Sequence, residues 1–143
     1  MIYLDTSFLT PLFREEASSR KVSAFLSRQE PGSLAISQWV GVEFASLTSR
    51  DVRVGELSAA EGRQLLGEFE ALVATALNTL TPGASDFALA QQYVSHFSTS
   101  LRGPDALHLA IARNHGAEFV ATLDEGMLSA AKKLKVAARR GIR

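Results

Sequence analysis

Short apolar runs alternate with longer amphipathic stretches along this chain, and the alternation predicts strands that are separated by helices. Four short runs are rich in β-forming residues and are predicted to be strands: 2–4, 34–36, 77–80 and 118–123. A further edge strand is expected near Val136. Strands that alternate with helices indicate a three-layer α/β/α sandwich around a mainly parallel sheet. The pattern does not give the order of the strands.

Between the strands, apolar residues recur at the spacing of amphipathic helices. One stretch, SRDVRVGE (residues 49–56), is mostly polar and is predicted to be a loop. Helices are expected over 17–29, 38–49, 58–76, 86–97 and 125–134, with one more beginning near 7–13 and one between 104 and 116.

Capping residues mark where several of these helices begin and end. Ser58 and Glu61 have the spacing of a capping box, in which side chain and backbone satisfy each other's donors. Ser37 can cap the helix that follows it. Pro104 suits the first position of a helix, and Gly116 suits the position just after a helix end.

Composition indicates one globular domain spanning residues 1–143. Hydrophobic residues make up 46% of the chain and charged residues 21%, which are ordinary values for a folded domain. Cysteine is absent, which excludes disulfides and thiolate metal sites and fits a reducing compartment. The first residues lack the basic region of a signal peptide, and no apolar run approaches the roughly 20 residues of a membrane span. A cytoplasmic protein with no membrane association is expected.

Basic and acidic residues balance at 15 each, which argues against a protein that coats nucleic acid by charge alone. The C-terminal segment departs from this balance, because it is basic with no acidic residue. Two interpretations stay open for it: a solvated terminal face or a phosphate-binding edge. Its basic residues are Lys132, Lys133, Lys135, Arg139, Arg140 and Arg143.

Two aspartates follow directly on apolar runs. Asp5 ends the first predicted strand and Asp124 ends the fourth, and ligands of open α/β sheets bind at the carboxyl ends of the strands. Each aspartate taken alone is equally a helix cap, because aspartate often begins a helix. Their shared position makes both candidates for one site.

Two further acids lie where a surface acid is not expected. Glu43 falls within the apolar stripe of Val40, Phe44 and Leu47, so it faces a buried cation, a metal or a cleft. Asp105 lies in the first turn of a helix that is apolar nearly all round. The structural alternatives are an arginine ion pair for Glu43 and the helix macrodipole for Asp105.

Together these four acids indicate a site for a hard divalent cation, because carboxylate oxygens without cysteine suit Mg²⁺ or Mn²⁺. Zinc is disfavoured, since the three histidines show no ligand spacing with a matching carboxylate. Setting the four acids aside leaves 15 basic residues against 11 acidic ones. The remaining surface is therefore net positive and suits a polyanion held beside a metal.

Three segments, YLDTSFLTPLF, EFAS and LRGPDALHLAIARNHGAEFVATLDEGM, resemble the PIN domain, and most of all the VapC-type toxins of bacterial toxin–antitoxin pairs. The likeness runs from Ile2 to the final predicted helix. The resemblance implies a Mg²⁺- or Mn²⁺-dependent ribonuclease whose acidic quartet is Asp5, Glu43, Asp105 and Asp124. Asp5 and Asp105 would be metal ligands, Asp124 would hold a second metal or a water, and Glu43 would ligate through water or orient the nucleophile.

Four neighbours of the quartet are further candidates. Thr6, Ser7 and Thr122 would hydrogen-bond the carboxylates or a phosphate oxygen, and as residues at helix starts they need no function. Arg102 would clamp a phosphate or neutralise the acids. Two other residues stay open as well. His108 supports the site or only packs, and Trp39 belongs to the core or stacks on a base.

Family membership also implies partners. The substrate would be RNA, and an antitoxin would wrap the chain, with Leu9, Leu12 and Phe13 offering a groove for its amphipathic segment. Core packing is the competing explanation for these three residues. A homodimer is the usual assembly of the family. Two alternative functions stay open: a housekeeping RNA-processing PIN nuclease and a catalytically silent PIN-like binding module.

Overall fold

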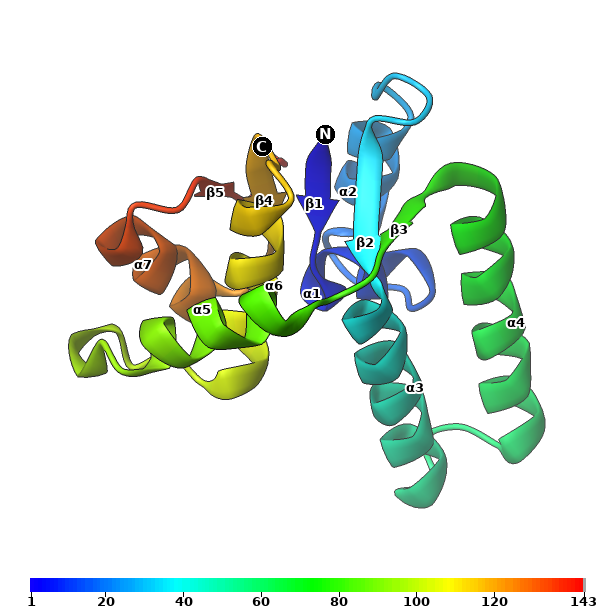
Figure 1. The fold of residues 1–143 in the computed structure, drawn as a ribbon. Helices are drawn as coiled ribbons and strands as arrows, with labels where there is room; N and C mark the ends of the chain where they lie inside the picture. Colours follow the sequence, from blue (N-terminus) through cyan, green and yellow to red (C-terminus); the bar gives the residue numbers. More distant parts are fainter. Residues whose placement is uncertain (143) are drawn as a thin grey trace.

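Five strands form one sheet in the computed structural model, which describes residues 1–142, and helices cover the sheet on both faces (Figure 1). Every pair of neighbouring strands is parallel. The predicted three-layer α/β/α architecture is therefore confirmed. In sheet order the strands are β3 (Asn78–Leu80), β2 (Leu34–Ser37), β1 (Ile2–Leu4), β4 (Phe119–Ala121) and β5 (Ala138–Arg139).

Each predicted helix is present, and the last one has the predicted bounds. The segment predicted near 7–13 divides into an α-helix and a short 3₁₀ turn, and the helix predicted over 86–97 ends earlier, at Val94, before a separate 3₁₀ turn. In chain order the helical elements are α1 (Thr6–Leu9), η1 (Thr10–Leu12), α2 (Ser19–Leu26), α3 (Gln38–Arg53), α4 (Ala59–Ala76), α5 (Ala84–Val94), η2 (Phe97–Thr99), α6 (Gly103–Asn114) and α7 (Glu125–Leu134).

The loop predicted over residues 49–56 is wrong for its first half, because α3 continues to Arg53. Asp51 explains the extension. Its carboxylate is buried, pairs with Arg14, and lies 3.1 Å from the guanidinium of Arg50. Asp51 is therefore an interior residue that faces the distant Arg14, and the polar pattern alone could not reveal that burial.

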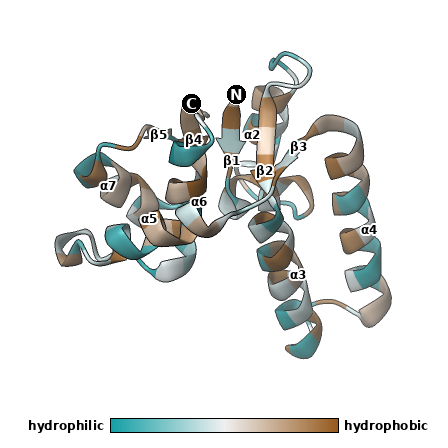
Figure 2. Cartoon of the chain, in the orientation of Figure 1, coloured by the Kyte–Doolittle hydropathy of each residue, from teal (hydrophilic) through white to brown (hydrophobic). Residues whose placement is uncertain are grey.

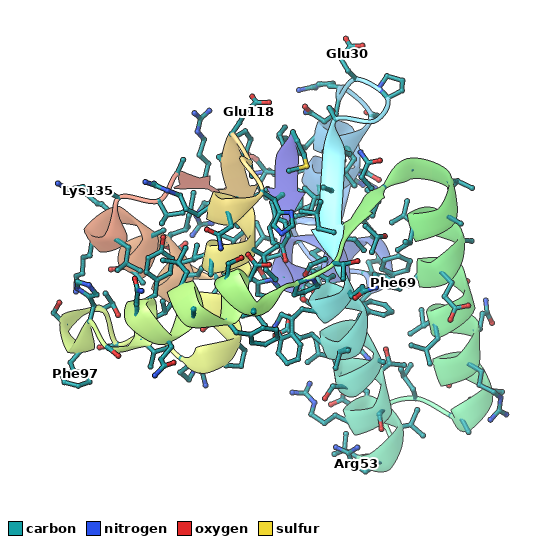
Figure 3. All side chains as sticks on the ribbon, in the orientation of Figure 1. Glu30, Arg53, Phe69, Phe97, Glu118 and Lys135 are labelled. Atoms are coloured by element: carbon teal, nitrogen blue, oxygen red, sulfur yellow. The ribbon has the colours of Figure 1, made fainter. Side chains whose placement is uncertain are left out.

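Helices α3 and α4 form a hairpin that extends past the carboxyl ends of the strands (Figure 1). Hydrophilic and hydrophobic residues alternate along both helices (Figure 2). The apolar side chains meet between them, where the rings of Phe44 and Phe69 stack with centroids 4.4 Å apart. Phe69 is labelled in Figure 3. The helices approach closely at Gly62, where an added Cβ would lie 2.8 Å from a methyl of Val52. The capping box of Ser58 and Glu61 is present as predicted.

Two capping predictions need correction. Ser37 occupies the N-cap position of α3, but its hydroxyl makes no capping bond and instead lies 2.8 Å from the hydroxyl of Tyr3. Pro104 is the second residue of α6 rather than the first, because the helix already begins at Gly103. Gly116 follows the end of that helix with a left-handed φ of 70°, as its predicted position requires.

The sheet has its topological switch point beside β1. From β1 the chain moves outward to β2 and β3, and it then crosses to the other side of β1 to form β4 and β5. Such a reversal opens a crevice at the carboxyl ends of the two strands between which it occurs. Here those strands are β1 and β4, and they lead to Asp5 and Asp124.

The last described residues return to the first helices. Gly141 has a φ of 68°, and a Cβ at this position would lie 3.2 Å from the ring of Phe25 and 3.3 Å from the ring of Phe8. Ile142 packs against the hydrophobic core beside them. Among residues 1–142, no helix has both the length and the apolar character that crossing a bilayer requires.

Candidate active site

A cavity of about 350 Å³ opens at the carboxyl ends of the strands, and all four predicted acids line it. The acids come from four separate parts of the fold: the end of β1, helix α3, the first turn of α6 and the N-cap of α7. The remaining lining residues are small, polar or imidazole side chains and one leucine. The complete lining is Asp5, Thr6, Ser7, Glu43, Ser46, Leu47, Asp105, His108 and Asp124.

Asp5 is the most buried of the four acids, with 3% of its surface exposed. It is the N-cap of α1 and accepts a hydrogen bond of 3.0 Å from the backbone N–H of Phe8. Ser7 and Thr122 donate their hydroxyls to its two oxygens, each at 2.9 Å. Burial nevertheless raises the pKa of Asp5 to about 6, because these bonds only partly replace the lost water.

Glu43 is held through one oxygen. The hydroxyl of Thr6 and the Nε2 of His108 both bond to Oε2, the latter at 2.6 Å. Burial alone would raise the pKa of Glu43, but the bonds from His108 and Thr6 hold that pKa below its ordinary value. Glu43 is therefore held as an ionised carboxylate by Thr6 and His108.

Asp105 lies among charges of both signs. Burial raises its pKa, and the nearby carboxylates of Asp124 and Glu43 raise it further, while the guanidinium of Arg102 acts in the opposite direction. Asp124 caps α7 by accepting a 2.7 Å bond from the backbone N–H of Met127. Burial and the neighbouring carboxylates both disfavour the charged form of Asp105, and a bound cation would favour it.

The four accessory residues predicted from the sequence all lie at these acids. Thr6 bonds Glu43, and Ser7 and Thr122 bond Asp5. The hydroxyls of Ser7 and Thr122 are also 3.2 Å apart, so they form a small network between β1 and β4. Arg102 differs from these three, because it is exposed at the N-cap of α6.

The donor set suits Mg²⁺ or Mn²⁺, although it does not form a closed cage. Within residues 1–142, no three aspartate, glutamate or histidine side chains lie close enough together to hold one metal ion. Mg²⁺ commonly binds to one or two carboxylates and keeps several waters, so an open acidic cavity fits it better than a cage would. Asp5 and Asp105 could hold such an ion.

His108 was predicted either to support the site or only to pack, and the structure places it against Glu43. Its other ring nitrogen, Nδ1, lies 2.8 Å from the hydroxyl of Tyr3, which the sequence analysis did not single out. A tyrosine inside a buried three-residue strand was the available signal, because its hydroxyl must find a partner there.

Trp39 packs partly against the core. Leu9 is fully buried, which removes it from any docking groove.

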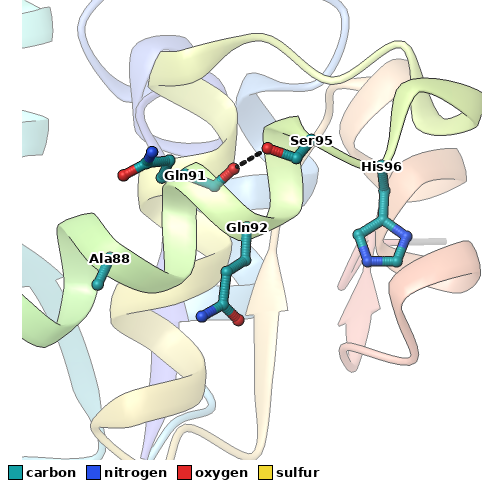
Figure 4. Close-up of a pocket in the computed structure, with 5 residues that line it drawn as sticks. All are labelled: Ala88, Gln91, Gln92, Ser95 and His96. Atoms are coloured by element: carbon teal, nitrogen blue, oxygen red, sulfur yellow. Dashed lines mark hydrogen bonds between the residues drawn. The ribbon is translucent and has the colours of Figure 1, made fainter.

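Another hollow, of about 580 Å³, lies on α5 and is lined by Gln91, Ser95 and His96 with no acid (Figure 4). The basic C-terminal residues are partly engaged elsewhere: Arg139 lies over the ring of Phe119 at 4.6 Å, and Arg140 pairs with Glu125. Lys133 donates to a backbone oxygen of η2. Arg143, the last residue of the predicted basic run, lies outside the described residues.

Comparison with known proteins agrees with this fold. A family model described as PIN domain matches residues 2–133. No curated protein matches the chain at the level of sequence.

Three solved structures illustrate the likeness in fold. FitAcB from Neisseria gonorrhoeae is 22% identical, with a TM-score of 0.75 over 99% of this chain and 98% of its own. VapC20 from Mycobacterium tuberculosis, a toxin that cleaves the sarcin–ricin loop, is 18% identical, with a TM-score of 0.73 over 91% and 95%. A toxin–antitoxin complex from Klebsiella pneumoniae is 19% identical, with a TM-score of 0.63 over 87% of both chains. At these identities the likeness shows a shared fold.

Proposed function

This chain belongs to the PIN domain family, and on that premise we propose that it is a Mg²⁺- or Mn²⁺-dependent endoribonuclease, the toxin of a VapC-type toxin–antitoxin pair. The observation that carries the proposal is the single cavity into which four elements bring Asp5, Glu43, Asp105 and Asp124. The toxins among the structural relatives support it. The whole chain would act as one catalytic domain in the cytoplasm.

The residues of the chain divide the work of phosphodiester hydrolysis. A bound divalent ion would supply a water of lowered pKa and would offset charge on the phosphate. Asp5 and Asp105 would hold that ion, and Asp124 would hold a second ion or a water. Glu43, ionised and fixed through Oε2, would orient the attacking water with Oε1. Arg102, exposed beside Asp105, would pair with a phosphate oxygen.

The decisive test compares Asp5→Asn with Asp86→Asn, since Asp86 is an equally buried aspartate outside the cavity. Purified proteins are incubated with RNA in Mg²⁺, in Mn²⁺ and in EDTA, and each is also expressed in bacteria from an inducible promoter. We expect the wild type and Asp86→Asn to cleave RNA and arrest growth, while Asp5→Asn does neither. Circular dichroism confirms that each variant is folded at the assay temperature.

Three outcomes would contradict the proposal in different ways. RNA binding without cleavage in any metal would favour a silent binding module. Metal-dependent cleavage without growth arrest would favour an RNA-processing nuclease. Cleavage that persists in EDTA would remove the metal from the mechanism.

We propose that the antitoxin segment docks in a groove of about 500 Å³ between η1 and the α3–α4 turn. Phe13 gives this groove an aromatic wall, and Glu15, Glu56 and Glu61 make it acidic, which suits a basic amphipathic segment. The adjacent reading frame should encode that partner. Charge reversal at Glu15 and Glu56 should weaken the complex and restore RNA cleavage in its presence. Unchanged affinity would move the docking site elsewhere.

We further propose a homodimer formed through an apolar cavity of about 460 Å³ that Trp39, Phe87, Val94 and Leu107 line. Phe87 is 56% exposed, which is unusual for a phenylalanine with no partner surface. Pro104 also lines the cavity and directly precedes Asp105, so a second copy there would bring two acidic cavities together. Light scattering should give a dimer for the wild type and a monomer for Phe87→Ser.

A further inference from the structure

Tyr3 is the one polar side chain in β1, and none of its surface is exposed. Its hydroxyl lies 2.8 Å from Oγ of Ser37 and 2.8 Å from Nδ1 of His108. The imidazole of His108 is 2% exposed, and its Nε2 lies 2.6 Å from Oε2 of Glu43. A continuous hydrogen-bonded chain therefore runs from Ser37 through Tyr3 and His108 to Glu43, across β2, β1, α6 and α3.

The positions of the hydrogen atoms in this series of hydrogen bonds follow from the groups at its two ends. The carboxylate of Glu43 only accepts, so Nε2 of His108 must carry a hydrogen to make the 2.6 Å contact. In a neutral imidazole, Nδ1 is then an acceptor, and the hydroxyl of Tyr3 is its donor. That hydroxyl has a single hydrogen, so it must accept from Ser37. The free hydroxyl of Ser37 agrees with this, since it does not cap α3.

We propose that Tyr3 is a positioning residue of the active site: by donating to Nδ1, it fixes His108 as the Nε2–H tautomer and so holds Oε2 of Glu43. This inference rests on the proposed nuclease function for its consequence in catalysis, although the tautomer itself does not depend on that function. The packing supports a fixed geometry, because the rings of Tyr3 and His108 are in contact with centroids 5.8 Å apart. The burial of both side chains leaves little room for water to replace the hydroxyl.

The experiment compares Tyr3→Phe with Tyr93→Phe. These are the two tyrosines of the chain, and Tyr93 is also buried but lies on α5, outside the acidic cavity. The protein is labelled with ¹⁵N in histidine, and the ring nitrogens are observed by NMR without added metal. His108→Gln assigns the signals of His108. We expect a neutral Nε2–H ring in the wild type and in Tyr93→Phe, and a mixture of tautomers in Tyr3→Phe.

RNA cleavage gives the catalytic readout. Removing an outer hydrogen-bond partner typically lowers activity roughly 10- to 100-fold, so kcat of Tyr3→Phe should fall by about tenfold or more, with KM nearly unchanged. Adding Tyr3→Phe to His108→Gln should cause no further loss, because the two act through one chain. A Tyr3→Phe protein that fails to fold is replaced by Ser37→Ala, which removes the first donor and should shift the same signals.

Three results would overturn the proposal: an imidazolium or Nδ1–H ring in the wild type, unchanged His108 signals in Tyr3→Phe, or additive losses in the double variant. If the wild type does not cleave RNA at all, the proposed nuclease function is wrong. The assignment of the His108 tautomer is unaffected by that result, because the NMR spectrum alone tests it.

Discussion

Two aspartates of nearly equal burial show how differently this fold treats a carboxylate. Asp5 is 3% exposed and Asp86 is 1% exposed, and each accepts a backbone N–H at the start of a helix. Burial raises the pKa of Asp5 to about 6. The pKa of Asp86 stays below its ordinary value although burial acts against it, because Gly83, Asn114 and His115 all bond to the carboxylate.

The partners explain the contrast. Asp86 accepts hydrogen bonds from the side-chain NH2 of Asn114 and from the backbone N–H of Gly83, each at 2.8 Å, and these N–H groups can only donate. Asp5 instead has two hydroxyl partners, Ser7 and Thr122, and a hydroxyl can donate or accept. Asp86 is thus fixed as a charged clasp between α5 and α6. The charged form of Asp5 is therefore less strongly stabilised than that of Asp86.

The largest effect should come from the acids of the cavity. Asp105→Asn removes a proposed metal ligand and relieves repulsion from Asp124, so RNA cleavage should fall by at least about 100-fold while the fold is kept. Cleavage assays and thermal unfolding of the same sample measure both effects. If the variant unfolds, Asp105 is needed for the stability of the fold, as Asp86 is expected to be.

Removing the Asp86 side chain should have the opposite effect to Asp105→Asn: stability should fall, and RNA cleavage should be kept. Asp86→Ala leaves the donors of Gly83, Asn114 and His115 without their acceptor, and the loss should be about 3–4 kcal/mol of unfolding free energy. Urea titration gives the value. RNA cleavage per folded molecule should stay close to that of the wild type, and a loss of cleavage would break the distinction.

The pH dependence of stability should separate Asp5 from Asp86 by its sign. The pKa of Asp5 is raised, so its contribution is fully present below about pH 4 and is lost as the pH rises through about 6, at a cost of up to about 3 kcal/mol in EDTA. The pKa of Asp86 is lowered, so its contribution is present above pH 4 and is lost as the pH falls below that value.

Asp5→Asn isolates the first of these terms. It should be more stable than the wild type at pH 7.5 and nearly equal to it at pH 4, when both are measured in EDTA by urea titration. A constant difference across this range would mean that Asp5 does not titrate there. Mg²⁺ should then stabilise the wild type and leave Asp5→Asn unaffected, because only the wild type keeps the ligand.

The smallest expected effect is the loss of one exposed helix cap, and it gives a reference for the stability loss of Asp86→Ala. Ser58→Ala removes an exposed cap from α4, and the loss should be about 1 kcal/mol. Urea titration of Ser58→Ala and Asp86→Ala compares their losses in unfolding free energy. The difference shows how much Asp86 contributes beyond the capping of a helix. Equal losses would mean that Asn114 and His115 add nothing to the contribution of Asp86.

Much of the fold could be predicted because local rules and tertiary packing agree. The capping box at Ser58 and the bounds of α7 follow from residues a few positions apart, and both are observed. Residues 49–53 could not be predicted as helix, because what stabilises them is the burial of Asp51 against Arg14 from a distant segment. Helical pattern carries no information about such a partner.

The site divides in the same way. The positions of Asp5 and Asp124 at strand ends followed from parallel strands sharing one edge, and Glu43 followed from its place in an apolar stripe. The partner of Ser37 did not follow, because an N-cap position predicts a bond to the nearby backbone, whereas the hydroxyl turns to Tyr3. Contacts between segments that are far apart in the sequence cannot be predicted from the local pattern of a single sequence.

The close approach of Gly141 to Phe8 and Phe25 links the end of the described chain to the helix that Asp5 caps. A single methyl group at residue 141 would strain its left-handed backbone and press on two aromatic rings, one of which, Phe8, lies one turn beyond Asp5. Position 141 is therefore far from Asp5 along the sequence yet packs against the helix that Asp5 caps, so a substitution there should disturb the candidate site as well as the fold.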